Sequence, residues 1–158
     1  MLFAALLAAT PTAASSAPAA ATPTHSQFDE SQQSKLAAWL GAWRCTPVGG
    51  GTAETSVGRL RGHYYVTRYA GANSLTAYSR WDPIEKAYYT VRILDAGGVQ
   101  VFKTASPDPA NGVWVAVFPD RIKGRAVETT LLNDRMTWGD MRTVGIDCRK
   151  QRDAASRR

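Results

Sequence analysis

The feature that most restricts the fold of this chain is a succession of short β-type runs. From Trp43 onward, β-branched and aromatic residues gather in these runs, and Gly, Pro, Asn and Asp separate them. Short connections join antiparallel neighbours, and closing the sheet removes its exposed edges, so the pattern predicts an all-β, antiparallel up-and-down barrel of about eight to ten strands. The expected strands are 42–48, 53–60, 63–70, 74–82, 87–95, 98–105, 112–118, 124–132, 135–141 and 143–149.

A short N-terminal helix is expected before the first strand. Ser26, three residues before Asp29, is a capping signal, and Leu36 and Trp39 share one helical face that ends near Gly41. A chain of 158 residues fits one domain with one core, which we place at residues 28–150.

The first residues are typical of an export signal. An apolar run extends from Leu2 to Ala9, and small residues follow it, with cleavage options of the A-x-A type near Ala17 to Ala21. We therefore expect a signal peptide over residues 1–21, a flexible lead-in over 22–27 and a secreted or periplasmic protein. A disordered tail rich in Ala and Pro is the alternative.

Most of the formal net charge of +6 lies at the C-terminus, where the last ten residues carry +4. We expect residues 151–158 to form a basic tail, either simply solvated or in weak contact with an anionic envelope surface. The sequence contains no basic motif interleaved with aromatic residues, so it favours no specific nucleic-acid interface. The C-terminal cations are Arg149, Lys150, Arg152, Arg157 and Arg158.

The two cysteines lie near opposite ends of the expected barrel. Closure pairs the first strand with the last, which makes Cys45 and Cys148 lateral neighbours, and export would expose them to an oxidising compartment. We therefore expect a structural disulfide. Two thiolates alone make no zinc site, and the redox spacing C-x-x-C does not occur.

Short motifs along the chain resemble those of the lipocalin and wider calycin barrels, in particular the lipocalin-like barrels of bacteria. They are Gly41-Ala42-Trp43 after a short helix, the aromatic-rich Gly62 to Val66, the turn Trp81-Asp82-Pro83, and the segment from Tyr88 to Gly98. The resemblance covers residues 36–150 and implies a barrel that binds a small molecule. It also implies that Arg142 or Arg149 packs on Trp43. No histidine follows His63, which disfavours haem, and we expect no cofactor.

Strand alternation suggests which side chains line the interior. The more apolar faces are expected to point inward, and they contain Tyr65 and Tyr69, then Trp81, then Tyr89 with Val91 and Ile93. On the opposite faces, Arg80 and Arg92 are expected to point to solvent; if inward, they could hold a carboxylate. The expected ligand-binding residues are Tyr65, Tyr69, Trp81, Tyr89 and Trp114, with simple core packing as the alternative.

The strand from Val113 to Phe118 is apolar on both faces, which predicts that the helix or another protein covers its outer face. Asp82 and Asp95 lie at expected turns, where carboxylates usually bind backbone amides. Neither G-x-S-x-G nor a phosphate-binding Gly loop occurs, so catalysis finds little support.

Together these features predict an exported barrel that binds a small apolar or amphipathic molecule without a covalent bond. The alternative is a structural or interaction protein of the envelope with a side-chain-filled interior.

Overall fold

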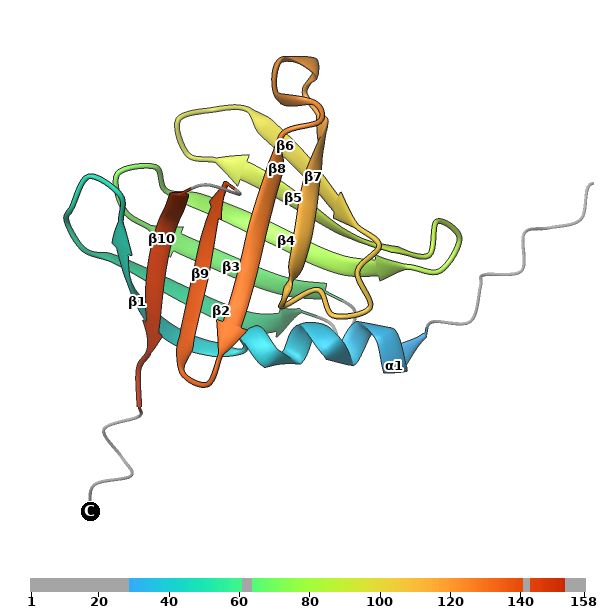
Figure 1. The fold of residues 1–158 in the computed structure, drawn as a ribbon, viewed down its shortest axis with the longest axis horizontal. Helices are drawn as coiled ribbons and strands as arrows, with labels where there is room; N and C mark the ends of the chain where they lie inside the picture. Colours follow the sequence, from blue (N-terminus) through green and yellow to red (C-terminus); the bar gives the residue numbers. More distant parts are fainter. Residues whose placement is uncertain (1–28, 61–63, 141–142, 153–158) are drawn as a thin grey trace, which may run out of the picture.

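The computed structural model describes residues 29–60, 64–140 and 143–152. Within these residues the chain forms ten strands that close into one antiparallel barrel (Figure 1). Each strand pairs with its neighbours in the chain, and β1 pairs with β10, so the predicted up-and-down barrel is confirmed. The strands are β1 (Gly41–Pro47), β2 (Ala53–Leu60), β3 (Tyr64–Ala70), β4 (Leu75–Asp82), β5 (Ala87–Leu94), β6 (Val99–Thr104), β7 (Gly112–Phe118), β8 (Ala126–Leu132), β9 (Arg135–Asp140) and β10 (Thr143–Lys150).

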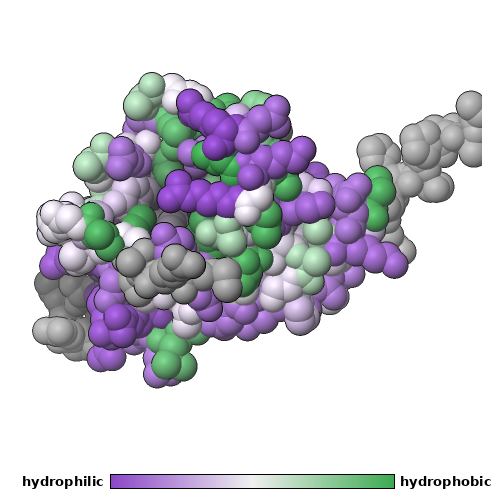
Figure 2. Space-filling model, turned by 45° about the horizontal axis from the view of Figure 1, so that its top comes forward, coloured by the Kyte–Doolittle hydropathy of each residue, from purple (hydrophilic) through white to green (hydrophobic). Residues whose placement is uncertain are grey.

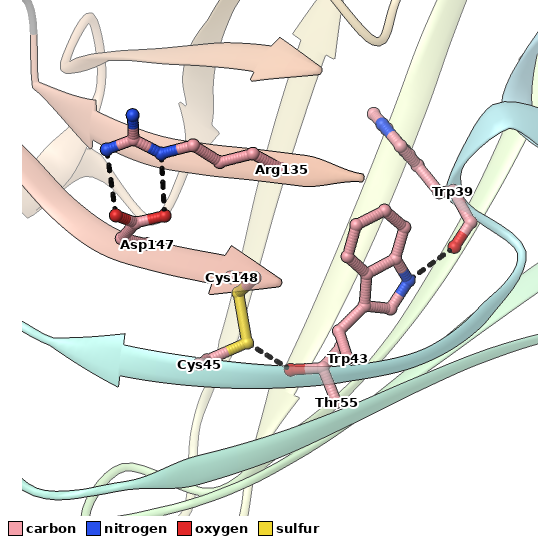
Figure 3. The surroundings of a disulfide bond; sticks show 7 residues. All are labelled: Trp39, Trp43, Cys45, Thr55, Arg135, Asp147 and Cys148. Carbon is pink, nitrogen blue, oxygen red and sulfur yellow. Dashed lines mark hydrogen bonds and ion pairs between the residues drawn. A yellow bond between two sulfur atoms is a disulfide. The ribbon is translucent and has the colours of Figure 1, made fainter. Parts of the chain in front are cut away.

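A disulfide crosses the seam between β1 and β10, as expected. Cys45 and Cys148 are direct partners in the register, 103 residues apart in sequence, and both are buried. Their bond lies beside the Thr55 hydroxyl, 3.3 Å from the Cys45 Sγ (Figure 3). On the outer face of the neighbouring pair of β9 and β10, Arg135 forms a two-pronged ion pair with Asp147 at 2.8 and 3.0 Å. Closure therefore combines the pairing of β1 with β10 and a covalent bond across it.

The N-terminal helical segment covers one end of the barrel. It starts as α1 (Glu30–Gln33) and continues as the 3₁₀ segment η1 (Ser34–Trp39), which runs across the lower end in Figure 1. Asp29 caps it by accepting a hydrogen bond from the Gln32 amide at 3.2 Å, because a short carboxylate reaches the free N–H groups of the first turn. The predicted cap, Ser26, lies outside the described residues.

Hydrogen bonds from both distant and nearby residues of the barrel fix the helical segment in place. The Gln33 Oε1 accepts from the Trp81 amide at 2.6 Å, and the Tyr88 hydroxyl donates to the Gln32 carbonyl at 2.9 Å. The Trp43 Nε1 donates to the Trp39 carbonyl at 2.9 Å (Figure 3). Trp39 also packs on the Trp114 ring, with ring centres 5.9 Å apart. This end of the barrel is therefore closed.

The helix does not cover the outer face of β7, contrary to one of the two expectations for that strand. Val113 and Val115 are 40% and 37% exposed, because α1 packs at the end of β4 instead. A short 3₁₀ turn, η2 (Asp120–Ile122), occupies the connection from β7 to β8 at the opposite, open end.

The cation over Trp43 is Lys150, whose Nζ lies 5.3 Å from the ring centre. Arg149 is placed on the other face of β10, opposite Arg44, because strand alternation separates it from Lys150. The other candidate, Arg142, lies outside the described residues.

Candidate ligand cavity

A cavity of about 420 Å³ lies at the end of the barrel opposite the helix. This volume falls within the range of small-molecule sites, about 300–1,000 Å³. In the view onto this end, hydrophobic surface shows between hydrophilic side chains (Figure 2). The lining includes the apolar or aromatic residues Tyr69, Leu75, Phe102, Ile122, Val127, Trp138 and Ile146, and the polar or charged residues Asn73, Arg92, Gln100, Arg125 and Asp140.

Arg92 lies in the deep part of this cavity. Its guanidinium carbon is 4.3 Å from the centre of the Phe102 ring and 5.7 Å from that of Trp138, so two aromatic side chains hold it. Among the residues that the structure describes, no carboxylate forms an ion pair with Arg92 and no group accepts a hydrogen bond from its guanidinium. Asp140, the carboxylate in the lining, is engaged in another interaction.

Burial lowers the pKa of Arg92 to about 10. The cause is desolvation, because a low-dielectric surrounding disfavours the charged form of a base. The guanidinium nevertheless remains charged at neutral pH. Arg92 thus places a positive charge inside the barrel without a described counter-ion, which is an unfavourable arrangement unless a ligand supplies the negative charge.

A second, smaller cavity of about 20 Å³ lies between Arg92 and the closed end. This is enough space for one water molecule. Leu75, Arg92 and Trp138 border both cavities, so Arg92 marks the floor of the larger one. Below it, the hydroxyls of Ser79 and Thr90 hydrogen-bond to each other at 2.6 Å.

Two indole N–H groups near this floor are also without partners. The Nε1 atoms of Trp39 and Trp138 are buried, and within the described part of the chain neither finds an acceptor. Together with Arg92, they add hydrogen-bond donors to the threonine and serine hydroxyls that line the small cavity. A site of this composition suits a ligand that carries acceptor oxygens.

The structure distributes the predicted ligand-binding residues between the two ends of the barrel. Tyr69 lines the large cavity, and Trp114 borders the small one. Tyr65 is buried but borders neither cavity. Trp81 lies at the closed end, where its ring packs on Tyr88 with centres 4.8 Å apart. The inward faces expected for β3 and β4 are the observed ones, since Thr67, Ala77 and Ser79 are buried.

The face assigned to β5 is wrong. Tyr89 belongs to the outer surface, with Val91 and Ile93, whereas Tyr88 is fully buried and Thr90 and Arg92 border the small cavity. The register explains the reversal: Thr90 lies directly opposite Ser79, and residues directly opposite each other share a face. With Ser79 inward, Thr90 and Arg92 must also point inward.

On the sequence alone, Arg92 is expected to face solvent and to bind a carboxylate only if it points inward, and neither Phe102 nor Trp138 is singled out. Phe102 lies opposite Thr90 in the register between β5 and β6 and shares its inward face, so the same error concealed both positions. Trp138 lies on β9, two residues after the buried Met136, so strand alternation places both on the inward face. The correct face of β5 would have revealed Arg92 and Phe102.

The geometry defines a class: a ten-stranded antiparallel barrel, counted over the described residues, that is closed at one end and contains a ligand-sized cavity at the other. This is consistent with a lipocalin-like barrel in general. No protein-family model, curated protein or solved structure matches the chain.

Among the described residues, no three His, Cys, Asp or Glu side chains come together as metal ligands. The helices of the described segments are all too short or too polar to cross a membrane. His63 lies outside the described residues.

Proposed function

We propose that the protein binds a small apolar or amphipathic molecule non-covalently in the cavity of about 420 Å³. The single observation that carries this proposal is the cavity itself, whose wall combines apolar and polar side chains above a closed floor at Arg92. A barrel filled by its own side chains would have no such volume. At about 30 Å³ per water-sized group, the cavity has room for on the order of ten to fifteen non-hydrogen atoms.

The proposal includes export to a secreted or periplasmic location. The disulfide between Cys45 and Cys148 supports it, because such bonds persist in oxidising compartments. The expected signal peptide, residues 1–21, lies outside the described residues. Thiol titration of the naturally produced protein tests this point, and two free thiols would contradict it.

Binding is tested with a neutral apolar fluorophore, N-phenylnaphthylamine, and a matched pair of variants. Val127→Phe adds a ring to the cavity wall, and Val113→Phe adds the same ring to the exposed face of β7. We expect V127F to weaken binding at least about tenfold by occupying the volume, and V113F to leave it within about twofold. Equal binding to the wild type, V127F and V113F would place the fluorophore outside the cavity and contradict the proposal.

A second candidate function is that of an interaction protein of the envelope. The observation in its favour is the uncovered outer face of β7 and its neighbour β6, which exposes Val113, Val115, Phe118 and Val99. The test is co-purification with envelope partners after Val115→Lys. If V115K abolishes the association while N-phenylnaphthylamine fails to bind the wild type, this function replaces ligand binding.

A further inference from the structure

The charge inside the barrel restricts the chemistry of the ligand. Arg92 presents its guanidinium between the Phe102 and Trp138 rings at the cavity floor. Ring faces attract a cation but leave its in-plane N–H donors available for acceptors. The described residues provide no acceptor for those donors.

We infer that the ligand is an amphipathic organic anion whose carboxylate binds Arg92 at the floor and whose apolar part extends toward the open end. This inference rests on the proposed binding function and specifies the chemical class of its ligand. Arginine matches a carboxylate particularly well, because two parallel N–H groups can donate to its two oxygens.

The lining of the cavity supports this orientation. Arg92 borders the small cavity as well as the large one, so the charged group lies deep. Leu75, Phe102 and Val127 provide apolar contacts for the rest of the molecule. Arg125, an exposed cation in the lining, would attract an anion as it enters. One half-buried cation at the floor fits a monoanion better than a doubly charged phosphate ester.

The test compares three ligands with the same alkyl chain: decanoate, 1-decanol and decylamine. Their affinities are measured by titration calorimetry at neutral pH with the wild-type protein freed of bound material. We expect decanoate to bind on the order of 10- to 100-fold more tightly than 1-decanol, the range of a charge-assisted hydrogen-bond pair, and decylamine to bind most weakly.

Variants then assign the preference to one residue. Arg92→Met removes the charge and keeps a side chain of similar length, so decanoate is expected to fall to the affinity of 1-decanol. Arg92→Lys is expected to retain part of the preference. Arg68→Met is the matched control, because Arg68 is exposed on the outer face of β3, and we expect it to bind like the wild type. Loss of the preference in R68M would overturn the assignment to Arg92.

The outcomes separate this inference from the proposed function. Equal binding of decanoate and 1-decanol to the wild type, or tightest binding of decylamine, would contradict the inference that the ligand is an anion. The proposed binding function would be unaffected. Failure of all three ligands and of N-phenylnaphthylamine would overturn the binding function itself. Because the wild-type comparison is decisive alone, the inference stays testable even if R92M does not fold.

Discussion

Replacing Arg92 with methionine is expected to stabilise the ligand-free protein. The guanidinium occupies a desolvated position between Phe102 and Trp138 and has no counter-ion in the described part of the chain. Methionine removes the buried charge and keeps an unbranched side chain that adapts to the same space. A binding residue that lowers stability in the absence of its ligand is a common compromise at functional sites.

The pKa of Arg92 gives the size of the effect. Its fall from the ordinary value of an arginine to about 10 corresponds to a cost on the order of 3 kcal/mol for folding with the charge in place. Because the folded pKa lies below the unfolded one, this cost is fully present below pH 10 and disappears only as the pH rises to the pKa of the unfolded arginine. Contacts with two rings, about 0.5–1 kcal/mol each, offset part of it. We therefore expect a net gain of about 1–2 kcal/mol at neutral pH.

Urea unfolding of ligand-free protein at neutral pH measures this gain. The midpoint should rise for R92M with an unchanged slope, whereas Arg68→Met, on the exposed outer face of β3, should stay within about 0.5 kcal/mol of the wild type. With decanoate present, the wild type should gain stability and R92M should not. A loss of more than about 1 kcal/mol in ligand-free R92M would show that the guanidinium is paired within the folded protein, which refutes the reasoning.

Three further predictions concern the seam, the closed end and the tail. Replacing Cys45 and Cys148 with alanine should lower the free energy of unfolding by about 2–5 kcal/mol in denaturant titrations, and a change under about 1 kcal/mol would contradict a stabilising seam. Burial, followed by the charges of Asp29 and Asp108, raises the pKa of Tyr88 to about 12, so an alkaline absorbance titration should show a tyrosine that ionises near pH 12. Because the unfolded tyrosine ionises first, stability should fall as the pH rises from 10 toward 12. Changing Arg157 and Arg158 to glutamine should weaken binding to anionic vesicles about tenfold or more and leave neutral vesicles unaffected; equal binding would exclude a role for the tail.

The sequence was sufficient for the architecture because local signals agreed with one another. Turn residues marked the strand ends, the short connections implied antiparallel neighbours, and closure then placed Cys45 beside Cys148. The position of the helix could not be read in the same way. Its apolar residues, Leu36 and Trp39, indicate that it packs on the barrel. Whether it lies on the wall or the end depends on hydrogen bonds that Gln33 accepts and Tyr88 donates, between residues about fifty positions apart in the chain.

The interior of β5 was predictable by a different rule from the one applied. Hydrophobicity favours Tyr89, Val91 and Ile93 as the inward set, and Ile93 is nevertheless 46% exposed. The turn between β4 and β5 pairs Asp82 with Ala87, so odd-numbered residues of β4 lie opposite even-numbered residues of β5.

That pairing makes an inward Ser79 and an inward Tyr89 incompatible, because residues directly opposite each other share a face. Turning β5 over would restore an apolar inner face, yet it would shift every side chain of the strand to the other side and separate the Tyr88 hydroxyl from the Gln32 carbonyl. Turn length and the anchoring of the helix therefore outweigh the hydrophobic preference of this strand. Arg92 faces the cavity because Ser79 and Tyr88 face inward, which makes the buried charge a fixed property of the barrel.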